Sequence, residues 1–242
     1  MSLAGELVAL GLRPGSRVVV HSSLRAVGAG AEEVLAALME TVGPDGLVVA
    51  PTFTYDNATF DPAETPSRTG ALSEALRRRP DAVRSLHPTY SVAALGAGAA
   101  ELCEGHELLA ATAVGSPLDR LAASGGAVLL LGVGQTANTT IHVGEVHAEA
   151  PYLDIPFDPT WPTGGHKSFP GCSRAFAALE HPLRERSAIR DGQVGNALAQ
   201  LVPGAALIDE TVALLRSSPT ALLCTDPLCY RCSRARVRSR EP

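Results

Sequence analysis

Hydrophobic and polar residues follow two alternating patterns along the first half of the chain. Continuous apolar runs rich in Val, Leu and Ala predict buried strands at 17–21, 47–53, 89–95 and 127–132. Apolar residues at helical spacing predict helices between them, at 3–12, 31–42, 70–79 and 116–124. Strands that alternate with helices are typical of a parallel sheet covered on its faces. We therefore predict an α/β fold with a mainly parallel central sheet flanked by helices.

The periodic pattern stops near residue 150. From 151 to 171 the chain is rich in Pro, Gly and Asp with scattered aromatics, which predicts an irregular lobe or a substrate-covering insertion. The last dozen residues are basic and poor in apolar side chains, so we expect them to be mobile. The prediction is a core at 1–150, a covering lobe with C-terminal elements of the same domain at 151–232, and a mobile basic tail at 233–242.

Composition is that of a globular chain with an uneven charge. The 242 residues are 45% hydrophobic, which is ample for a buried core. The formal charge is -5, but five arginines lie between Arg231 and Arg240, so residues 1–230 carry 15 basic and 24 acidic side chains. An acidic body suits a polycationic ligand, because negative clefts concentrate cations. The same balance is also a common solubility device.

Nothing at the start of the sequence resembles a targeting signal. Residues 1–6 lack the basic region and apolar stretch of a secretory leader, and no uninterrupted apolar run is long enough to span a bilayer. We therefore expect a cytoplasmic protein without a membrane partner.

One helical segment carries candidate acid–base chemistry. His142 and Glu145 are three residues apart, a spacing that places both side chains on one face of a helix. A carboxylate bonded to one ring nitrogen fixes the tautomer and raises the basicity of the other, as general-base catalysis requires. The spacing alone also fits a solvated surface pair.

Several segments in the same order support the catalytic interpretation. Together they resemble the aminoglycoside 3-N-acetyltransferases, which acetylate a 3-amino group with acetyl-coenzyme A. The segments that carry the resemblance are Val18–Leu24, Leu47–Phe53, Arg68–Glu74, Arg84–Pro88, Gly115–Leu121, Asn138–Glu145, Pro151–Tyr152 and Gly192–Ala197. The resemblance implies an antibiotic N-acetyltransferase-like fold whose 1–150 core binds acetyl-CoA. It also implies direct transfer in a ternary complex, with His142 as general base oriented by Glu145.

The resemblance also suggests cofactor contacts. Ser22, Ser23 and Leu24 follow a predicted strand, where backbone N–H groups and hydroxyls could hold the pantetheine arm or the pyrophosphate. Other candidates for the cofactor site are Arg84, His87 and Ser116. Arginine matches phosphate geometry, although Arg84 could equally be a solvated helix charge, and Ser116 is a helix cap whether or not it touches a ligand.

An aminoglycoside needs carboxylates and hydroxyls to pair with its ammonium groups. The candidates are Asp56 and Asp61 in the loop after the second predicted strand, and Glu180 downstream. Each could instead be a turn or surface residue. His21, at a strand end, is interpreted as a structural histidine.

Four of the five cysteines predict a metal site. Clustered cysteines in a reducing cytoplasm suggest metal before disulfide, and four thiolates make a closed tetrahedral zinc site. The ligands would be Cys172, Cys224, Cys229 and Cys232. The apramycin-acetylating branch of the family resembles this arrangement, which implies a structural zinc that ties the C-terminal segment to the irregular lobe. The alternative is unconnected reduced thiols, and Cys103 is interpreted as a small buried hydrophobe.

Two other functions stay open on the sequence. One is an acyltransferase of the same fold that acts on another amine, because a fold and a base do not choose the acceptor. The other is a zinc-dependent nucleic-acid binder, suggested by Cys229–Cys232 and the arginine-rich tail. The acidic body argues against a nucleic-acid partner, and pairing of the chain into a homodimer is left open.

Overall fold

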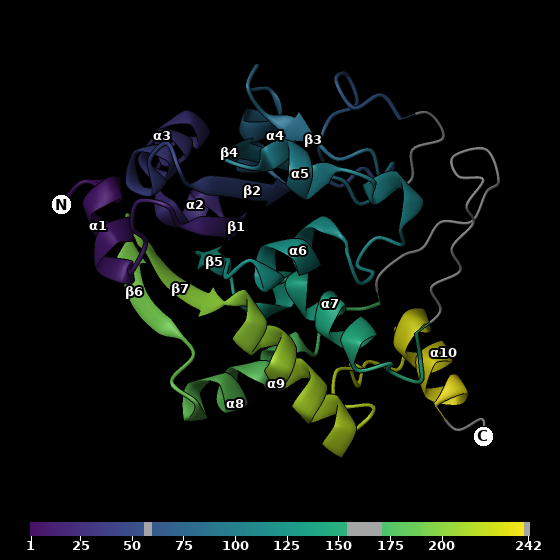
Figure 1. The fold of residues 1–242 in the computed structure, drawn as a ribbon. Coiled ribbons are helices and arrows are strands. Elements are labelled where there is room, and N and C mark those ends of the chain that lie inside the picture. The colour runs from purple at the N-terminus through teal and green to yellow at the C-terminus, as the bar shows by residue number, and fades with distance from the viewer. Residues whose placement is uncertain (56–59, 154–170, 240–242) are drawn as a thin grey trace.

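The computed structural model describes residues 1–55, 60–153 and 171–239, and these contain one seven-stranded sheet (Figure 1). Its strand order is β3-β4-β2-β1-β5-β7-β6. The strands are β1 (Arg17–Ser22), β2 (Leu47–Pro51), β3 (Val83–Arg84), β4 (Val92–Gly96), β5 (Ala127–Leu131), β6 (Arg190–Val194) and β7 (Ala197–Pro203).

The sheet is mixed, so the prediction of a mainly parallel sheet is wrong. Only the central strands are parallel, with β1 paired to β2 on one side and to β5 on the other. Both edges are antiparallel: β4 pairs with β2 and β3, and β7 pairs with β5 and β6.

Short connections at the two edges explain the difference. β6 and β7 are joined through Gly195 and Asn196, and a two-residue connection can join only antiparallel neighbours. Gly195 has a φ of 58°, a left-handed conformation that glycine adopts without strain. β3 and β4 are separated by seven residues, too few for the crossover that a parallel pair needs.

Helices cover both faces of the sheet (Figure 1). They are α1 (Leu3–Leu10), α2 (Leu24–Val27), α3 (Ala31–Val42), α4 (Ala71–Arg77), α5 (Ala99–Cys103), α6 (Pro117–Ala123), α7 (Thr140–His147), α8 (Glu180–Glu185), α9 (Gly204–Ser217) and α10 (Tyr230–Arg238). Short 3-10 turns lie at His106–Leu108, Gln135–Ala137 and Phe176–Leu179.

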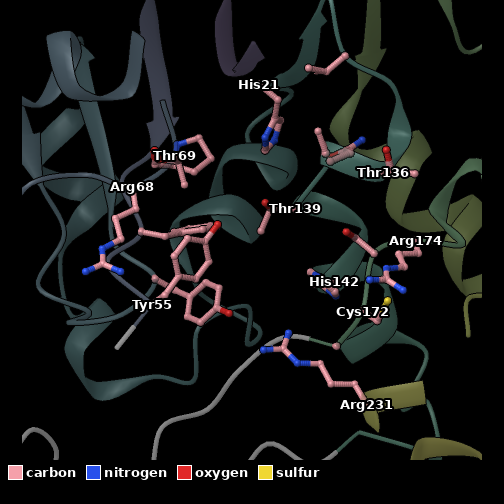
Figure 2. A pocket seen from close by; sticks show the side chains of 18 of the residues that line it. His21, Tyr55, Arg68, Thr69, Thr136, Thr139, His142, Cys172, Arg174 and Arg231 are labelled. Atoms are coloured by element: carbon pink, nitrogen blue, oxygen red, sulfur yellow. Dashed lines mark hydrogen bonds between the residues drawn. The ribbon is translucent and has the colours of Figure 1, made fainter. Parts of the chain in front are cut away.

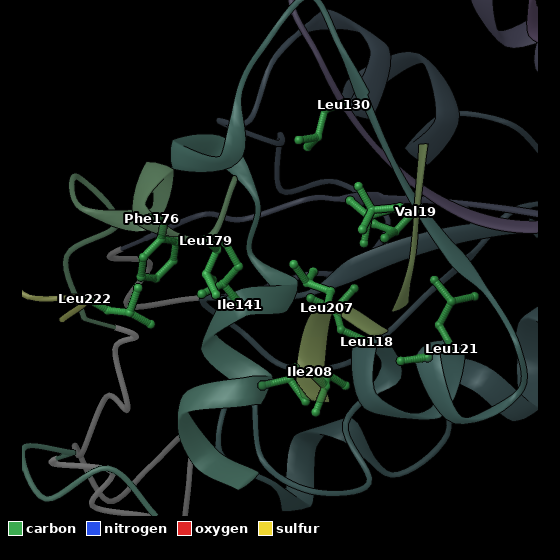
Figure 3. Close-up of a cluster of buried hydrophobic side chains, with 14 of the residues drawn as sticks. Val19, Leu118, Leu121, Leu130, Ile141, Phe176, Leu179, Leu207, Ile208 and Leu222 are labelled. Carbon is green, nitrogen blue, oxygen red and sulfur yellow. The ribbon is translucent and has the colours of Figure 1, made fainter. Parts of the chain in front are cut away.

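Alternate residues of the central strands enter two separate cores. Val18 and Val20 of β1 face the core shared with α1, α3 and α4, whereas Val19 faces the core shared with α5, α6, α7 and α9 (Figure 3). Because both faces are buried, these strands read as continuous apolar runs. The second core also contains Phe176 and Leu222, so the C-terminal third of the chain packs onto the face that carries α7.

The last segment differs from the expected mobile tail. α10 extends to Arg238, and its Cys232 and Ala235 are buried in the same core as α7. Within the described part of the chain, no helix combines the length and the apolar character that crossing a membrane would require.

Candidate active site

A cavity of about 790 Å³ opens at the edge of the sheet where β1 and β2 end (Figure 2). His21 and Ser22 reach it from β1, and Pro51 reaches it from β2. The segment before α7 contributes residues 136–139, and α7 itself contributes His142. The opposite wall is made by residues 171–174 and 228–231. Loops that follow parallel strands therefore meet here, as is usual for ligand sites in α/β proteins.

His142 and Glu145 form a buried pair on α7. The Nδ1–H of His142 donates to Oε2 of Glu145 at 2.6 Å, and the two side chains are 8% and 2% exposed. The hydroxyl of Tyr152 donates to Oε1 of the same carboxylate at 2.8 Å. Burial raises the pKa of Tyr152, so it remains a donor. Such burial separates this pair from a solvated i,i+3 pair.

The imidazole is also held from its other sides. The ring of Phe176 packs edge-on against it with centroids 4.7 Å apart. At the start of α7, Oδ1 of Asn138 accepts from the backbone N–H of Thr140 at 3.1 Å, and Nδ2 of Asn138 donates to Gln135 at 2.9 Å. The helix start and the ring are therefore both fixed by side chains that are themselves buried.

Aromatic side chains form the wall across the cavity from α7 (Figure 2). The rings of Phe53 and Tyr90 lie 4.6 Å apart, and Tyr55 lies edge-on to Tyr90 at 6.0 Å. Arg231 hydrogen-bonds Tyr90 from the C-terminal segment. Burial raises the pKa of Tyr90 to about 12, against the lowering effect of the Arg231 charge. This wall joins residues from distant parts of the chain, so their spacing carried no signal of it.

The predicted cofactor segment reaches the cavity in part. Ser22 lines the cavity, whereas Ser23 and Leu24 are not among its lining residues. The backbone N–H of Ser23 donates to the Leu131 carbonyl at 2.8 Å, and Leu24 packs against the core beside α3. His21, interpreted as structural, does line the cavity.

Arg84, His87 and Ser116 do not line the cavity. The guanidinium of Arg84 donates to the carbonyls of Thr52 at 2.8 Å and Thr65 at 2.6 Å, so it fastens the loop after β2 to the sheet. His87 is buried, and its Nδ1 accepts from the backbone N–H of Tyr90 at 3.0 Å.

Ser116 occupies the N-cap position of α6, as expected, but its side chain makes no capping hydrogen bond.

The predicted substrate carboxylates are dispersed. Asp56 lies outside the described residues. Asp61 is exposed, and its Oδ1 accepts from the backbone N–H of Ala63 at 2.8 Å, which is turn chemistry. Glu180, on α8, is not a lining residue and pairs with Arg184 at 2.8 Å.

The four predicted metal ligands are brought together. The sulfurs of Cys172, Cys224, Cys229 and Cys232 all lie within 4.8 Å of one another, and those of Cys172 and Cys224 are 3.9 Å apart. A tetrahedral zinc with Zn–S bonds of about 2.3 Å separates its sulfurs by about 3.8 Å, so this donor set fits zinc. Cys172 and Cys229 also line the cavity, so the cluster borders the candidate active site.

These features define an α/β protein with a buried, carboxylate-oriented imidazole in a large cavity. The family model described as aminoglycoside 3-N-acetyltransferase matches residues 19–216. An aminoglycoside N(3)-acetyltransferase IV from Salmonella sp is 34% identical over 233 residues, covering 91% of this chain and 88% of that protein.

Solved structures agree with the sequence comparison. The apoenzyme of the aminoglycoside acetyltransferase AAC(3)-IVa superimposes with a TM-score of 0.89 at 32% identity, covering 98% of this chain and 96% of that one. AAC-IIIb with CoASH has a TM-score of 0.76 at 32% identity, covering 89% and 95%. Mutants of AAC(3)-IVa have been solved with a gentamicin and with apramycin. The chain belongs to the aminoglycoside 3-N-acetyltransferase family, and it is an enzyme rather than a nucleic-acid-binding protein.

Proposed function

We propose that this enzyme transfers the acetyl group of acetyl-CoA directly to the 3-amino group of an aminoglycoside, with His142 as the general base. The observation that carries the proposal is the buried hydrogen bond between His142 Nδ1 and Glu145, in a side chain that lines the cavity. A proton on Nδ1 leaves Nε2 as the nitrogen that can accept one. An alkylamine is mostly protonated at neutral pH, so it must lose a proton before it attacks a thioester.

Glu145 has two tasks in this proposal. Its carboxylate keeps the ring in the required tautomer, and it balances the imidazolium that forms when the amine proton arrives. The Tyr152 hydroxyl holds the second carboxylate oxygen, which limits rotation of the carboxylate. The pair is an acid–base device, so we assign no nucleophile and no acyl-enzyme.

The two substrates are inferred from the relatives. AAC-IIIb binds CoASH, and AAC(3)-IVa binds a gentamicin and apramycin. We propose that Ser22 contributes to the acetyl-CoA site, because it lines the cavity at the end of a central strand. For the aminoglycoside, we retain Asp56 and Asp61 in the loop after β2, together with the Phe53, Tyr55 and Tyr90 wall, whose faces can pack on a sugar and attract its ammonium groups.

We also propose a structural zinc at the cysteine cluster. Its four ligands join residue 172 to the C-terminal segment, and the ion pair between Arg174 and Asp226 joins the same two segments. Four protein thiolates leave no open coordination position, so the ion would have no part in the chemistry of transfer.

The test is acetyl transfer by purified enzyme, followed as thiol release from acetyl-CoA with apramycin, gentamicin and a set of unrelated amines. We expect release with aminoglycosides and a loss of about 10²–10⁴-fold in kcat for His142→Ala, with CoA affinity retained. Identification of the acetylated nitrogen by NMR tests the 3-position. Release with unrelated amines alone, or full turnover by folded His142→Ala, would refute the proposal.

A further inference from the structure

A second histidine in the cavity has an unmet hydrogen-bonding requirement. His21 lies near the end of β1, is 7% exposed and lines the cavity, into which its imidazole points (Figure 2). Its Nε2 is buried and has no hydrogen-bond partner among the described residues. Buried polar atoms in native proteins are nearly always paired, and leaving one unpaired costs about 1–3 kcal/mol. A bound ligand that supplied the partner would recover this free energy.

The surroundings of His21 indicate what kind of ligand that is. β1 lies between β2 and β5, so its neighbours at this end of the cavity come from those strands and the segments that follow them. The described lining residues there are uncharged: Val20, Ser22, Pro51, Thr136, Ala137 and Asn138. The charged lining residues come from other segments, as Arg68, Arg174 and Arg231. An uncharged end favours an uncharged portion of a ligand.

His21 itself is uncharged at neutral pH. Burial lowers its pKa to about 4, so the ring carries one N–H donor and one acceptor nitrogen. A neutral imidazole offers no negative charge to an ammonium group, and a polycationic antibiotic would therefore gain little from it. An amide, with one donor and one acceptor of its own, is matched to it.

We propose that His21 is a binding residue for the acyl donor, and that its Nε2 hydrogen-bonds an amide of the pantetheine arm of coenzyme A. This inference rests on the proposed function, because it takes acetyl-CoA as the co-substrate. It assigns to His21 a role different from that of His142. His142 has a carboxylate partner and exchanges a proton, whereas His21 positions the arm and keeps its protonation state.

The experiment measures CoA binding by titration calorimetry for wild type, His21→Leu and His21→Gln. Leu fills a similar volume without a polar atom, whereas the amide of Gln can reach the position of Nε2. We expect His21→Leu to raise the Kd for CoA about tenfold and His21→Gln to recover most of the loss. Adenosine 3′,5′-bisphosphate lacks the pantetheine arm, so its Kd should be the same for all three proteins.

A matched control is His106→Gln, which changes a buried histidine outside the cavity and should leave the Kd for CoA unchanged. Wild-type CoA affinity in folded His21→Leu, or an equal loss for CoA and the bisphosphate, would overturn the inference while leaving the proposed function intact. Failure of the wild type to bind CoA would overturn both. Should His21→Leu not fold, NMR of ¹⁵N-histidine-labelled wild type serves instead. CoA, but not the bisphosphate, must then shift the Nε2 signal of an imidazole that is still neutral at pH 5.5.

Discussion

The backbone of Gly144 in α7 lies directly against the side chain of Thr211 in α9, and a Cβ at residue 144 would fall 2.5 Å from the Thr211 Cβ. Gly144 stands between His142 and Glu145 in the helix that carries the proposed base. A glycine inside a helix is about 1 kcal/mol less favourable than alanine, so local propensity does not explain it. The close approach of α9 does, because only a residue without a side chain leaves room for Thr211.

Gly144→Ala should therefore destabilise the enzyme although alanine is the better helix former. Thr211 is fully buried and bonded to the Leu207 carbonyl, so it cannot easily move aside. We expect a loss of about 1–3 kcal/mol in the free energy of unfolding, and a lower kcat as α7 shifts. Urea unfolding measures the first. The control Gly134→Ala, which adds a Cβ with no atom within 4 Å, should stay within about 0.5 kcal/mol of wild type.

Continuous apolar runs predicted the four strands β1, β2, β4 and β5. They did not reveal β6, whose residues Arg190–Val194 are mostly exposed at the edge of the sheet, so that no apolar run marks them. β3 has only two residues, too few for any periodicity. The antiparallel edges are formed by these two short strands together with their partners, and this is why the sheet was predicted as mainly parallel.

The candidate site was predictable where its residues are neighbours in sequence. His142 and Glu145 share one helix face, and the cysteines form a recognisable cluster, so spacing and residue type identified both. Tyr152 and Arg231 depend on chain segments that meet only in the folded state. Arg84 illustrates the opposite case, because its guanidinium is satisfied by backbone carbonyls that the sequence cannot place.

Tyr152→Phe should slow turnover without weakening substrate binding. The hydroxyl that donates to Glu145 Oε1 at 2.8 Å would be lost, leaving a buried carboxylate oxygen without this partner. We expect kcat to fall about 3–30-fold, corresponding to about 1–2 kcal/mol for a hydrogen bond to a charged group. Glu145→Gln should cost more than Tyr152→Phe and less than His142→Ala. Equal activity in wild type and folded Glu145→Gln would show that the carboxylate does not assist the ring.

Acid should destabilise the enzyme through three buried histidines. Burial lowers the pKa values of His21 to about 4, His87 to about 3 and His106 to about 4, against about 6.5 in the unfolded chain. Between pH 6.5 and 4 the unfolded chain therefore binds more protons than the folded one. The free energy of unfolding must fall as pH decreases through this window, by up to about 4 kcal/mol per pH unit for three sites.

Single substitutions separate these histidines from other acid-sensitive groups. His106 donates from Nε2 to the Ala111 carbonyl and accepts at Nδ1 from Ser85, and protonation would break the second bond. His106→Gln should reduce the pH slope near pH 5 by about one proton. The control His181→Gln changes an exposed side chain and should leave the slope unchanged. Denaturant midpoints between pH 4.5 and 7.5 measure both, and equal slopes in all three proteins would contradict the assignment.

Metal removal should loosen one wall of the cavity along with the C-terminal segment. Two of the proposed zinc ligands, Cys172 and Cys229, line the cavity, and Arg231 on the same segment contacts Tyr90 on the aromatic wall. We expect one zinc per chain by elemental analysis of purified enzyme. Chelation, or Cys229→Ser, should lower Tm and raise the KM for the aminoglycoside, because Arg231 and its neighbours would lose their anchor. Cys103→Ala is the matched control, since Cys103 is a buried thiol outside the cluster whose pKa is raised to about 12 by burial. It should lose stability as a core truncation does while keeping its zinc. Metal-free enzyme with unchanged Tm and KM would reduce the cluster to four unconnected thiols.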